Sequence, residues 1–584
     1  MIQTLLAQAD GLWRAGRLAE AAAVAAQAVR SAPQSADAHH LAALILASAG
    51  RFAESLPLAE RGAALAPADA DAWSRAAAIA HNAGAMERAV ELSRRAMQVR
   101  PNVRGAPDTL IKALARLGRF RDAAQEAERA VAADPTNPVL PALAYMVLTR
   151  AGRVDLVFDL LRRGAAAHPN DLEVQAMNAF AYNYAPGASG EATLAAHVAY
   201  GQVAARAVAG VLPPPRAPSD PDRKLRVGLY SGDFRRHSVA YFARALFEHL
   251  DRRQFCVVAL SAVERHDDLT ALLRAQSDEW HDLGDASPAD LARAVRARDI
   301  DILIDLVGLT DYQQFAAFAA RPAPVQLTYC GYTNTTGLPG IDWRVVDRWT
   351  DPPEAHAWHS ERLLRLDRCF LCYTPPPDAP PVAAPPHERN GHVTFGSFNA
   401  LLKIHEGVIN LWTRTVNAVP AARLVLKNAG LIDAAVRAEL AQRFERAGLE
   451  RGRLDLEPLV PSTAGHLELY SRVDIGLDTF PFGGATTTCE ALHMGVPVVS
   501  LAQRSHVSRV GRSLLTAVGL GELAVDTEAA FVSTAAALAG DRHRLSALRL
   551  GLRDRLARSP LGDGADHAQH FGRALRQIWH TACS

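Results

Sequence analysis

The chain has 584 residues, which is enough for about three or four domains. Its hydrophobic content of 49% and its charged content of 21% are ordinary for a soluble globular protein. A formal net charge of +1 argues against binding to nucleic acid or to an anionic membrane surface, and no apolar run is long enough to cross a bilayer.

Two further features concern the cell compartment and metals. Charged residues interrupt the apolar positions of the N-terminal stretch, which therefore lacks the pattern of a signal peptide, and we expect a cytoplasmic protein. The six cysteines are scattered and predict no disulfide framework. Cys369 and Cys372 form a lone CxxC without a second pair to complete a zinc site, so we predict no metal site.

The first third of the chain is a repeat. Glycines and prolines recur at intervals of 34 residues, with a small residue in phase between them. These positions are Gly16, Gly50, Gly84, Gly118 and Gly152, then Pro33, Pro67, Pro101, Pro135 and Pro169, and then Ala28, Gly62, Ala96, Ala130 and Gly164. A 34-residue period with this punctuation is the tetratricopeptide pattern, in which each unit is a pair of antiparallel helices. We predict an α-solenoid of about five repeats over residues 1–185.

Such a solenoid presents a groove, which predicts a docking surface for a protein or peptide. A scaffold that serves only dimerisation or rigidity is the alternative, and a homodimer is left open. Residues 186–222 are predicted to hold one transition helix, at about 191–209, and a stiff proline-rich linker.

After the linker, short apolar strands alternate with helices, which predicts parallel, doubly wound sheets. A second proline tract near 375–386 divides this region into a first lobe at 223–385 and a second lobe at 386–584. In the first lobe we predict strands at 225–230, 255–260, 301–307, 324–329 and 343–346. In the second lobe we predict strands at 393–397, 423–427, 455–458, 473–477 and 497–501, and a C-terminal helix that crosses back onto the first lobe. The predicted fold class is therefore α + α/β, and its two lobes should enclose a cleft suited to a nucleotide-bearing substrate.

The strongest chemical signal lies in residues 474–500. A buried strand is followed by the turn Gly483-Gly484 and by a helix that begins with Thr486, Thr487 and Thr488. Glycines permit close approach of the backbone, and the free N–H groups of a first helical turn favour an anion, so this stretch predicts a diphosphate site. Three threonines that merely cap a helix are the alternative.

Other polar residues should face the same cleft. Asn399 and Lys403 follow a strand end, and a lysine there can neutralise a departing diphosphate. His466 could stack on a base, and Glu490 could accept hydrogen bonds from ribose. His237 follows the first strand and suits acid–base or hydrogen-bonding roles. Dinucleotide-binding, P-loop and HExxH motifs are all missing from the sequence.

In combination, these pieces resemble the catalytic region of the O-linked N-acetylglucosamine (O-GlcNAc) transferases, and of their bacterial members in particular. The resemblance runs from about 226 to 519, behind tetratricopeptide repeats. It rests on residues 226–237 including His237, on 321–326 with Gly331 and Tyr332, on 398–403, and on His466 followed by 474–497.

The resemblance implies a two-Rossmann-lobe (GT-B) glycosyltransferase that inverts the anomeric centre, needs no metal or other cofactor, and uses UDP-N-acetylglucosamine (UDP-GlcNAc) to modify Ser and Thr of proteins. His466 would lie near uracil and Glu490 would hold the ribose. The diphosphate would be held by Thr486, Thr487 and Lys403. His237 would lie near the acceptor, residues 331–337 with Gly331 and Tyr332 would line the sugar pocket, and acceptors would arrive along the solenoid. UDP is the expected product.

Three positions depart from the family pattern, namely Leu309, Ala400 and Ala485. The identity of the general base is left open. A protein O-fucosyltransferase that uses GDP-fucose has the same architecture, and the residues around 460–466 would distinguish the two donors. A nucleotide-binding scaffold with a degenerate transferase region is the third alternative.

Overall fold

A computed structural model describes residues 2–134, 137 and 139–584, and of Asp155 only the backbone. The chain divides into two compact units, one up to Ala151 and the other from Gly152 to Ser584. The domain boundaries expected at 185, 222 and 385 stay predictions. Pro135 of the predicted repeat lies outside the described residues.

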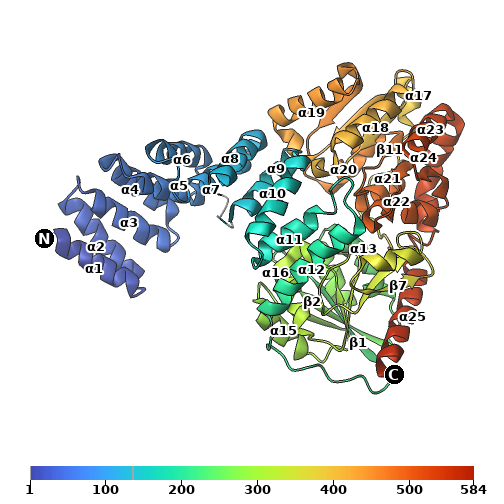
Figure 1. The fold of residues 1–584 in the computed structure, drawn as a ribbon, viewed down its shortest axis with the longest axis horizontal. Coiled ribbons are helices and arrows are strands. Elements are labelled where there is room, and N and C mark those ends of the chain that lie inside the picture. The colour runs from blue at the N-terminus through green and yellow to red at the C-terminus, as the bar shows by residue number, and fades with distance from the viewer. Residues whose placement is uncertain (1, 135–136, 138) are drawn as a thin grey trace. The chain divides into compact units, whose positions relative to one another are not determined.

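The first unit is helical (Figure 1). Its helices are α1 (Ile2–Arg14), α2 (Leu18–Ser31), α3 (Ala36–Ser48), α4 (Phe52–Leu65), α5 (Ala70–Asn82), α6 (Met86–Val99), α7 (Ala106–Arg116), α8 (Phe120–Ala133) and α9 (Val139–Arg150). All five repeat glycines, from Gly16 to Gly152, have a positive φ of 69–81°, the left-handed conformation in which glycine ends a helix. A Cβ at Gly62 would lie 2.3 Å from the His40 ring, so close helix packing explains the small residue at this position.

Three helices open the second unit: α10 (Val154–Ala167), α11 (Leu172–Ala181) and α12 (Gly190–Ala207). The last is the predicted transition helix. It packs so closely on the first lobe that a Cβ at Gly201 would lie 1.9 Å from the carbonyl oxygen of Gly337. Tyr200 of α12 is fully buried and shares an apolar cluster with Phe315 and Phe318 of the first lobe. These helices therefore support the first lobe.

The first lobe is a seven-stranded parallel sheet with the order β3-β2-β1-β4-β5-β6-β7. Its strands are β1 (Leu225–Ser231), β2 (Phe255–Ser261), β3 (Glu279–Asp282), β4 (Ile302–Asp305), β5 (Val325–Thr328), β6 (Trp343–Asp347) and β7 (Arg362–Leu366). The helices of this lobe are α13 (Ser238–His249), α14 (Asp268–Gln276), α15 (Pro288–Arg296) and α16 (Tyr312–Phe315). The sequence analysis missed β3 and β7, which are the two edge strands and contain charged, partly exposed residues that give no apolar run.

The second lobe is a six-stranded parallel sheet with the order β10-β9-β8-β11-β12-β13. Its strands are β8 (Thr394–Ser397), β9 (Arg423–Lys427), β10 (Leu454–Glu457), β11 (Ile475–Leu477), β12 (Val498–Leu501) and β13 (Ala524–Val525). Its helices are α17 (Pro386–Asn390), α18 (Glu406–Asn417), α19 (Ala434–Arg446), α20 (Thr463–Glu468), α21 (Thr486–His493), α22 (His506–Ala517), α23 (Glu528–Gly540) and α24 (Arg542–Ala557). In both sheets the strand order reverses beside the first strand of the lobe, and ligands of doubly wound folds bind at such points.

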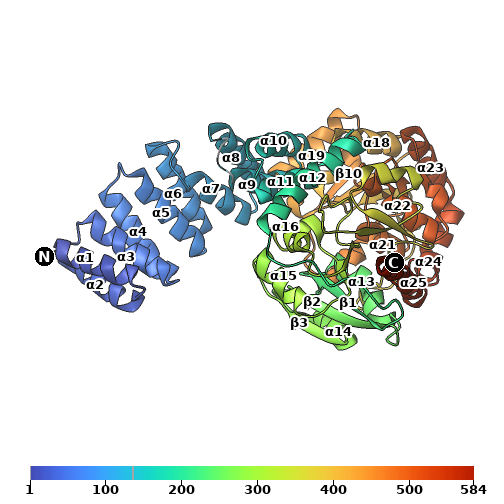
Figure 2. The ribbon, with the colours of Figure 1, turned by 60° about the horizontal axis from the view of Figure 1, so that its bottom comes forward.

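The C-terminal helix α25 (Gly564–Cys583) runs back along the first lobe, as predicted (Figures 1 and 2). It packs on α13. The Tyr329 hydroxyl lies 3.1 Å from Nε2 of His567, and the Trp579 indole donates to the carbonyl of Asp220 at 2.9 Å. Among the described residues, no helix combines the length and the apolar character that a membrane span requires.

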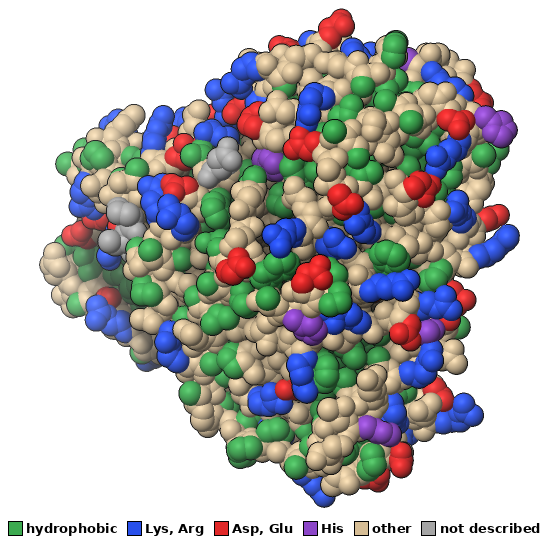
Figure 3. Space-filling model, turned by 45° about the vertical axis from the view of Figure 1, so that its right-hand side comes forward, with side chains coloured by type: hydrophobic (Ala, Val, Ile, Leu, Met, Phe, Trp, Pro, Cys, Tyr) green, Lys and Arg blue, Asp and Glu red, His purple; other side chains and the backbone are tan. Residues whose placement is uncertain are grey.

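Charged side chains of both signs are mixed over the face drawn in Figure 3, in keeping with the near-zero net charge of the sequence. This mixture gives no support to an electrostatic footprint for nucleic acid on that face.

Candidate active site

The turn that follows β11 is built around a buried carboxylate. Asp478 accepts hydrogen bonds from the backbone N–H of Gly484 at 2.7 Å and of Thr479 at 2.9 Å, and from the Ser500 hydroxyl at 2.8 Å. A Cβ at Gly483 would lie 2.9 Å from this carboxylate, which explains the glycine. The aspartate thus folds the chain back so that α21 begins directly after the turn.

The start of α21 leaves its first-turn N–H groups without a side-chain cap. The N-cap position is Ala485, which has no side chain that could accept a hydrogen bond. The hydroxyl of Thr488 donates backwards to the Gly484 carbonyl at 3.1 Å, and that of Thr487 lies 3.4 Å from Oδ1 of Asn399. Uncapped N–H groups at the positive end of a helix, preceded by glycines, are suited to an anion.

Lys403 reaches this turn from the end of β8. Its ammonium donates to the carbonyl of Gly483 at 2.7 Å and to Oδ1 of Asn399 at 3.4 Å, and it lies 3.9 Å from the centre of the Phe482 ring. Burial lowers the pKa of Lys403 to about 8. The structure therefore places Lys403, Asn399, Gly483, Gly484 and the three threonines together, around one spot.

His466 lies in a second group of polar residues on the same lobe. Its Nε2 lies 2.9 Å from Oε2 of Glu490, and its Nδ1 faces the ammonium of Lys427. Because a lysine ammonium can only donate, Nδ1 accepts and the ring proton sits on Nε2, pointing at Glu490. Burial lowers the pKa of Lys427 to about 8. The sequence analysis missed Lys427, whose only signal was a lysine at the end of an apolar strand.

The first lobe contributes a cavity of about 640 Å³ at the carboxyl ends of its strands. Residues that follow β1, β2, β4 and β5 line it, among them Asp233, His237, Asp311 and Gly331. A Cβ at Gly331 would lie 1.9 Å from the backbone oxygen of Leu306, so glycine is required there. The cavity thus contains two of the predicted site residues, His237 and Gly331.

His237 forms the N-cap of α13. Its Nδ1 lies 3.4 Å from the backbone nitrogen of Val239 and 3.4 Å from Oδ2 of Asp233. Burial lowers the pKa of His237, which favours the neutral ring near pH 7. In the neutral ring, Nδ1 accepts from the Val239 N–H and Nε2 carries the proton. This arrangement suits His237 to donating a hydrogen bond.

Tyr332 was expected to line the sugar pocket, but its side chain points into the supporting helices. Only 3% of it is exposed, and its hydroxyl is bonded to Nδ2 of Asn183 at 2.9 Å and to Nε2 of His197 at 2.7 Å. The Tyr332 hydroxyl is the polar partner of α12 and of the end of α11 in the apolar core, and the expectation that residues 331–337 line a sugar pocket stays a prediction. The sequence had not singled out Asn183 and His197.

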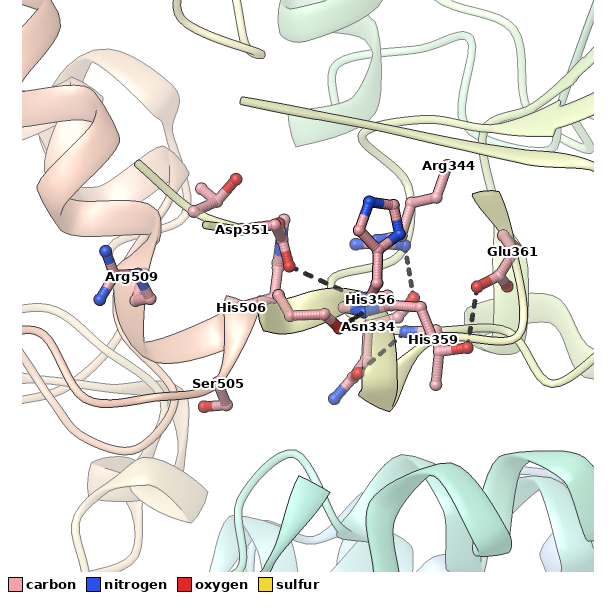
Figure 4. A network of polar contacts seen from close by, with 12 residues as sticks. Asn334, Arg344, Asp351, His356, His359, Glu361, Ser505, His506 and Arg509 are labelled. Atoms are coloured by element: carbon pink, nitrogen blue, oxygen red, sulfur yellow. Dashed lines mark hydrogen bonds and ion pairs between the residues drawn. The ribbon is translucent and has the colours of Figure 1, made fainter. Parts of the chain in front are cut away.

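The loop from 331 to 337 is held by a buried polar network (Figure 4). Arg344 donates to the carbonyl oxygens of Asn334 and, at 3.0 Å, of Tyr332. Glu361 accepts from the hydroxyl of Thr335 at 2.8 Å and from the backbone N–H of Thr336 at 2.6 Å. These bonds hold the backbone of the loop in one conformation.

The two lobes are tied together beside this network (Figure 4). His506, at the start of α22, donates from Nδ1 to Oδ2 of Asp351 in the first lobe at 2.5 Å, and Arg509 donates to the carbonyl of Trp349 at 2.8 Å. The paired histidines His506 and His359 hold the pKa of Asp351 below its ordinary value against the opposing effect of burial. These bonds fix the first-lobe loops against the second lobe.

The segment at the end of the first lobe packs on α13, on the side of this lobe that faces Glu490 of the second. The backbone of Thr374 donates to the carbonyl of Tyr241 in α13 at 3.0 Å, and the rings of Tyr241 and Tyr373 are 6.4 Å apart. Burial and, next in size, the charge of Glu490 raise the pKa of Tyr373. Helix α13, capped by His237, therefore lies on the side of the first lobe that faces Glu490.

Metal ligation has no support among the described residues, because no group of three or more His, Cys, Asp or Glu side chains could hold an ion there. Cys369 and Cys372 are both buried free thiols and form no disulfide. Leu309, one of the three departures, is buried in the first-lobe core.

Comparison with known proteins places this geometry in a family. The family model of glycosyl transferase family 41 matches residues 213–373 and 387–571. The chain belongs to this family. A solved structure of a Thermobaculum terrenum O-GlcNAc transferase mutant is 34% identical and has a TM-score of 0.78, with 88% of this chain and 98% of that chain covered. The predicted fold, a helical solenoid followed by two Rossmann-like lobes, is thereby confirmed.

Curated relatives match about three fifths of the chain. An Arabidopsis thaliana protein named probable UDP-N-acetylglucosamine–peptide N-acetylglucosaminyltransferase SPINDLY is 44% identical over 368 residues, which are 62% of this chain and 40% of that protein. A second A. thaliana protein, with the same enzyme name and the designation SEC, is 27% identical over 62% of this chain and 38% of its own length. The chain spans about two fifths of the length of these curated relatives.

Proposed function

We propose that this family 41 member transfers N-acetylglucosamine from UDP-GlcNAc to serine and threonine hydroxyls of proteins. The observation that carries the proposal is the joint placement of Lys403, the Gly483-Gly484 turn and the uncapped start of α21, on a lobe tied to a second lobe with its own cavity. The names of the relatives support the donor and the acceptor class. Acceptors would dock along the solenoid, and a cytoplasmic location remains a prediction.

The proposed reaction is a single displacement. The acceptor oxygen attacks the anomeric carbon, the bond from that carbon to the β-phosphate oxygen breaks, and its electron pair leaves with UDP. A single displacement inverts the anomeric centre, so the α-linked donor gives a β-linked product. Negative charge grows on the diphosphate during this step, and Lys403 together with the positive end of α21 would stabilise it without a metal.

The nucleoside would bind beside the polar group formed by His466, Glu490 and Lys427 on the second lobe. Glu490 is buried, and its carboxylate could accept hydrogen bonds from the ribose hydroxyls as well as from His466. The centre of the His466 ring lies 6.0 Å from the centre of the Phe398 ring, beside a surface where a base could stack. His237 would donate from Nε2 to the sugar or the acceptor in the first-lobe cavity.

Calorimetry with UDP, UDP-GlcNAc and GDP in the presence of EDTA tests the donor site, and transfer of labelled GlcNAc to a library of Ser- and Thr-containing peptides tests the activity. We expect UDP to bind in the micromolar range without metal and the peptide product to be β-linked by NMR. Preference for GDP, with transfer from GDP-fucose, would replace the donor. Absence of all nucleotide binding would overturn the proposal in favour of a scaffold.

A further inference from the structure

We propose that Asp311 is the general base that removes the proton from the acceptor hydroxyl. This inference deepens the proposed function and rests on it. Asp311 lines the first-lobe cavity together with His237 and Gly331, although the sequence analysis left the base open and did not consider this residue.

The fold holds Asp311 at a defined place. It follows β4 through the short turn Gly308–Asp311 and caps α16, where its Oδ1 accepts from the backbone N–H of Gln314 at 3.3 Å. The side chain of Gln314 is itself anchored, because its Nε2 donates to the carbonyl of Ala286 at 2.7 Å and to Oδ1 of Asp285 at 3.2 Å. Helix α16 also packs against α11 and α15 (Figures 1 and 2). The carboxylate is therefore positioned by its own hydrogen bond to the Gln314 backbone and by the hydrogen bonds that anchor the Gln314 side chain.

One oxygen of this carboxylate is available. Among the described residues, the bond from Gln314 is the only hydrogen bond recorded for Asp311, and none of the described ion pairs includes it. A base must have a free lone pair within reach of the proton that it removes, and geometry comes before basicity in choosing one. Asp311 has such a free lone pair.

The other carboxylates of this region are occupied or displaced. Asp233 pairs with Arg235 at 2.9 Å and lies 3.4 Å from Nδ1 of His237. Asp305 is fully buried and accepts from the backbone of Val307 and Gly308 and from Thr328. Glu264 lies on the exposed rim of the cavity. Within the described part of this cavity, Asp311 alone is a partly buried carboxylate that forms no ion pair.

The electrostatic setting matches the role. Burial is the main cause that raises the pKa of Asp311, and the negative charges of Asp285 and Asp233 add to it. The cavity also contains the cations Arg235 and Arg265 and the ring of His237. A carboxylate with a raised pKa is a stronger base. The His237 Nε2–H complements it as a donor.

A lone pair of Asp311 takes the hydroxyl proton of the acceptor serine or threonine while the acceptor oxygen bonds to the anomeric carbon. The bond from that carbon to the β-phosphate oxygen breaks, and its electron pair goes to UDP, whose charge Lys403 faces. Asp311 ends protonated and returns its proton to water after the products leave.

The experiment compares Asp311→Asn with wild type and with Asp541→Asn, a variant of another helix-capping aspartate, which caps α24 in the second lobe and does not line the cavity. Asparagine caps helices as well as aspartate does, so the first variant keeps the bond to Gln314 and removes only the basicity. The readouts are kcat for labelled transfer to the Ser/Thr peptide library, the Kd of UDP by calorimetry, and the pH profile of kcat/KM. Asp311→Ser, which also caps, serves as the second variant should the asparagine protein fail to fold.

We expect Asp311→Asn to lower kcat by about 10²- to 10⁴-fold, as for loss of a general base, with the Kd of UDP changed less than about twofold. The acid limb of the pH profile should disappear, Asp311→Glu should recover part of the rate, and Asp541→Asn should behave as wild type. A kcat within about threefold of wild type in the folded variant, or an unchanged acid limb, would overturn the assignment. If wild type itself transfers no sugar, the proposed function fails instead.

Discussion

The Lys403 ammonium can be removed with little change in shape. Lys403→Met keeps an unbranched apolar stem over the Phe482 ring and deletes the charge that lies 2.7 Å from the Gly483 carbonyl and 3.9 Å from the ring centre. The variant therefore separates the electrostatic role of this side chain from its packing.

The magnitude follows from the contacts. A charge-assisted hydrogen bond contributes about 1.5–3 kcal/mol, but in the free protein the ammonium already bonds to Gly483 and must give up part of that contact to bind a diphosphate. We therefore expect a net loss of about 1–3 kcal/mol, which is an increase of about 5- to 150-fold in the Kd of UDP.

The lowered pKa of Lys403 adds a pH dependence. With a pKa of about 8 in the folded protein, the ammonium loses its proton as the pH rises through 8, so the Kd of UDP for wild type should rise across this range and that of the variant should not. The effect of the same pKa on the stability of the folded protein has the opposite sign. Between pH 8 and 10.5 the unfolded chain binds more protons at this lysine, so its contribution to the free energy of unfolding increases with pH.

Calorimetric titrations of UDP from about pH 6.5 to 9.0 in EDTA, a range that spans the titration of Lys403, measure both effects. Lys224→Met is the matched control, because Lys224 is an exposed lysine just before β1. Equal affinity of wild type and Lys403→Met within about twofold, or the same rise in Kd with pH in both, would refute the role of Lys403 at the diphosphate.

Three further predictions concern the nucleoside site, the loop 331–337 and the contact between lobes. Glu490→Gln should raise the Kd of UDP about tenfold and that of 2′-deoxy-UDP less, which calorimetry checks; equal losses for both ligands would contradict ribose binding. Gly337→Ala should lower the free energy of unfolding in urea by about 3 kcal/mol, because its φ is 65° and the new Cβ would lie 2.1 Å from backbone atoms, whereas Gly391→Ala, with a φ of 72° and open space, should cost about 1 kcal/mol. His506→Ala should lower the same free energy by about 1.5–3 kcal/mol through loss of its bond to Asp351. Because burial lowers the pKa of His506 from its ordinary 6.5, the unfolded chain takes up a proton at this histidine that the folded protein does not, so the difference should shrink as the pH falls from about 7 to 5; a pH-independent difference would contradict a buried, neutral His506.

Local pattern was enough for much of the architecture. The 34-residue punctuation predicted the solenoid because a glycine in the left-handed conformation ends each first helix, as Gly50 and Gly84 do with φ of 72° and 81°. Strands that are buried on both faces, such as β4, consist mainly of apolar residues, so they could be recognised in the sequence. The edge strands β3 and β7 could not be recognised in this way, because a strand that is partly exposed to solvent needs no run of apolar residues.

The same division applies to the candidate site. The sequence by itself predicted the turn and the start of α21, since Gly483, Gly484 and Thr486 act through the conformation of their own segment; binding of a diphosphate there stays a prediction. Only the tertiary structure decided that Tyr332 turns into the helices. It also decided which distant side chains meet.

The pairs formed by Lys427 with His466 and by His506 with Asp351 show why. Their members are 39 and 155 positions apart in the chain. A residue's own neighbours set its dihedral angles and its tendency to be buried, but a pairing between elements depends on strand order and helix docking, which no local pattern records.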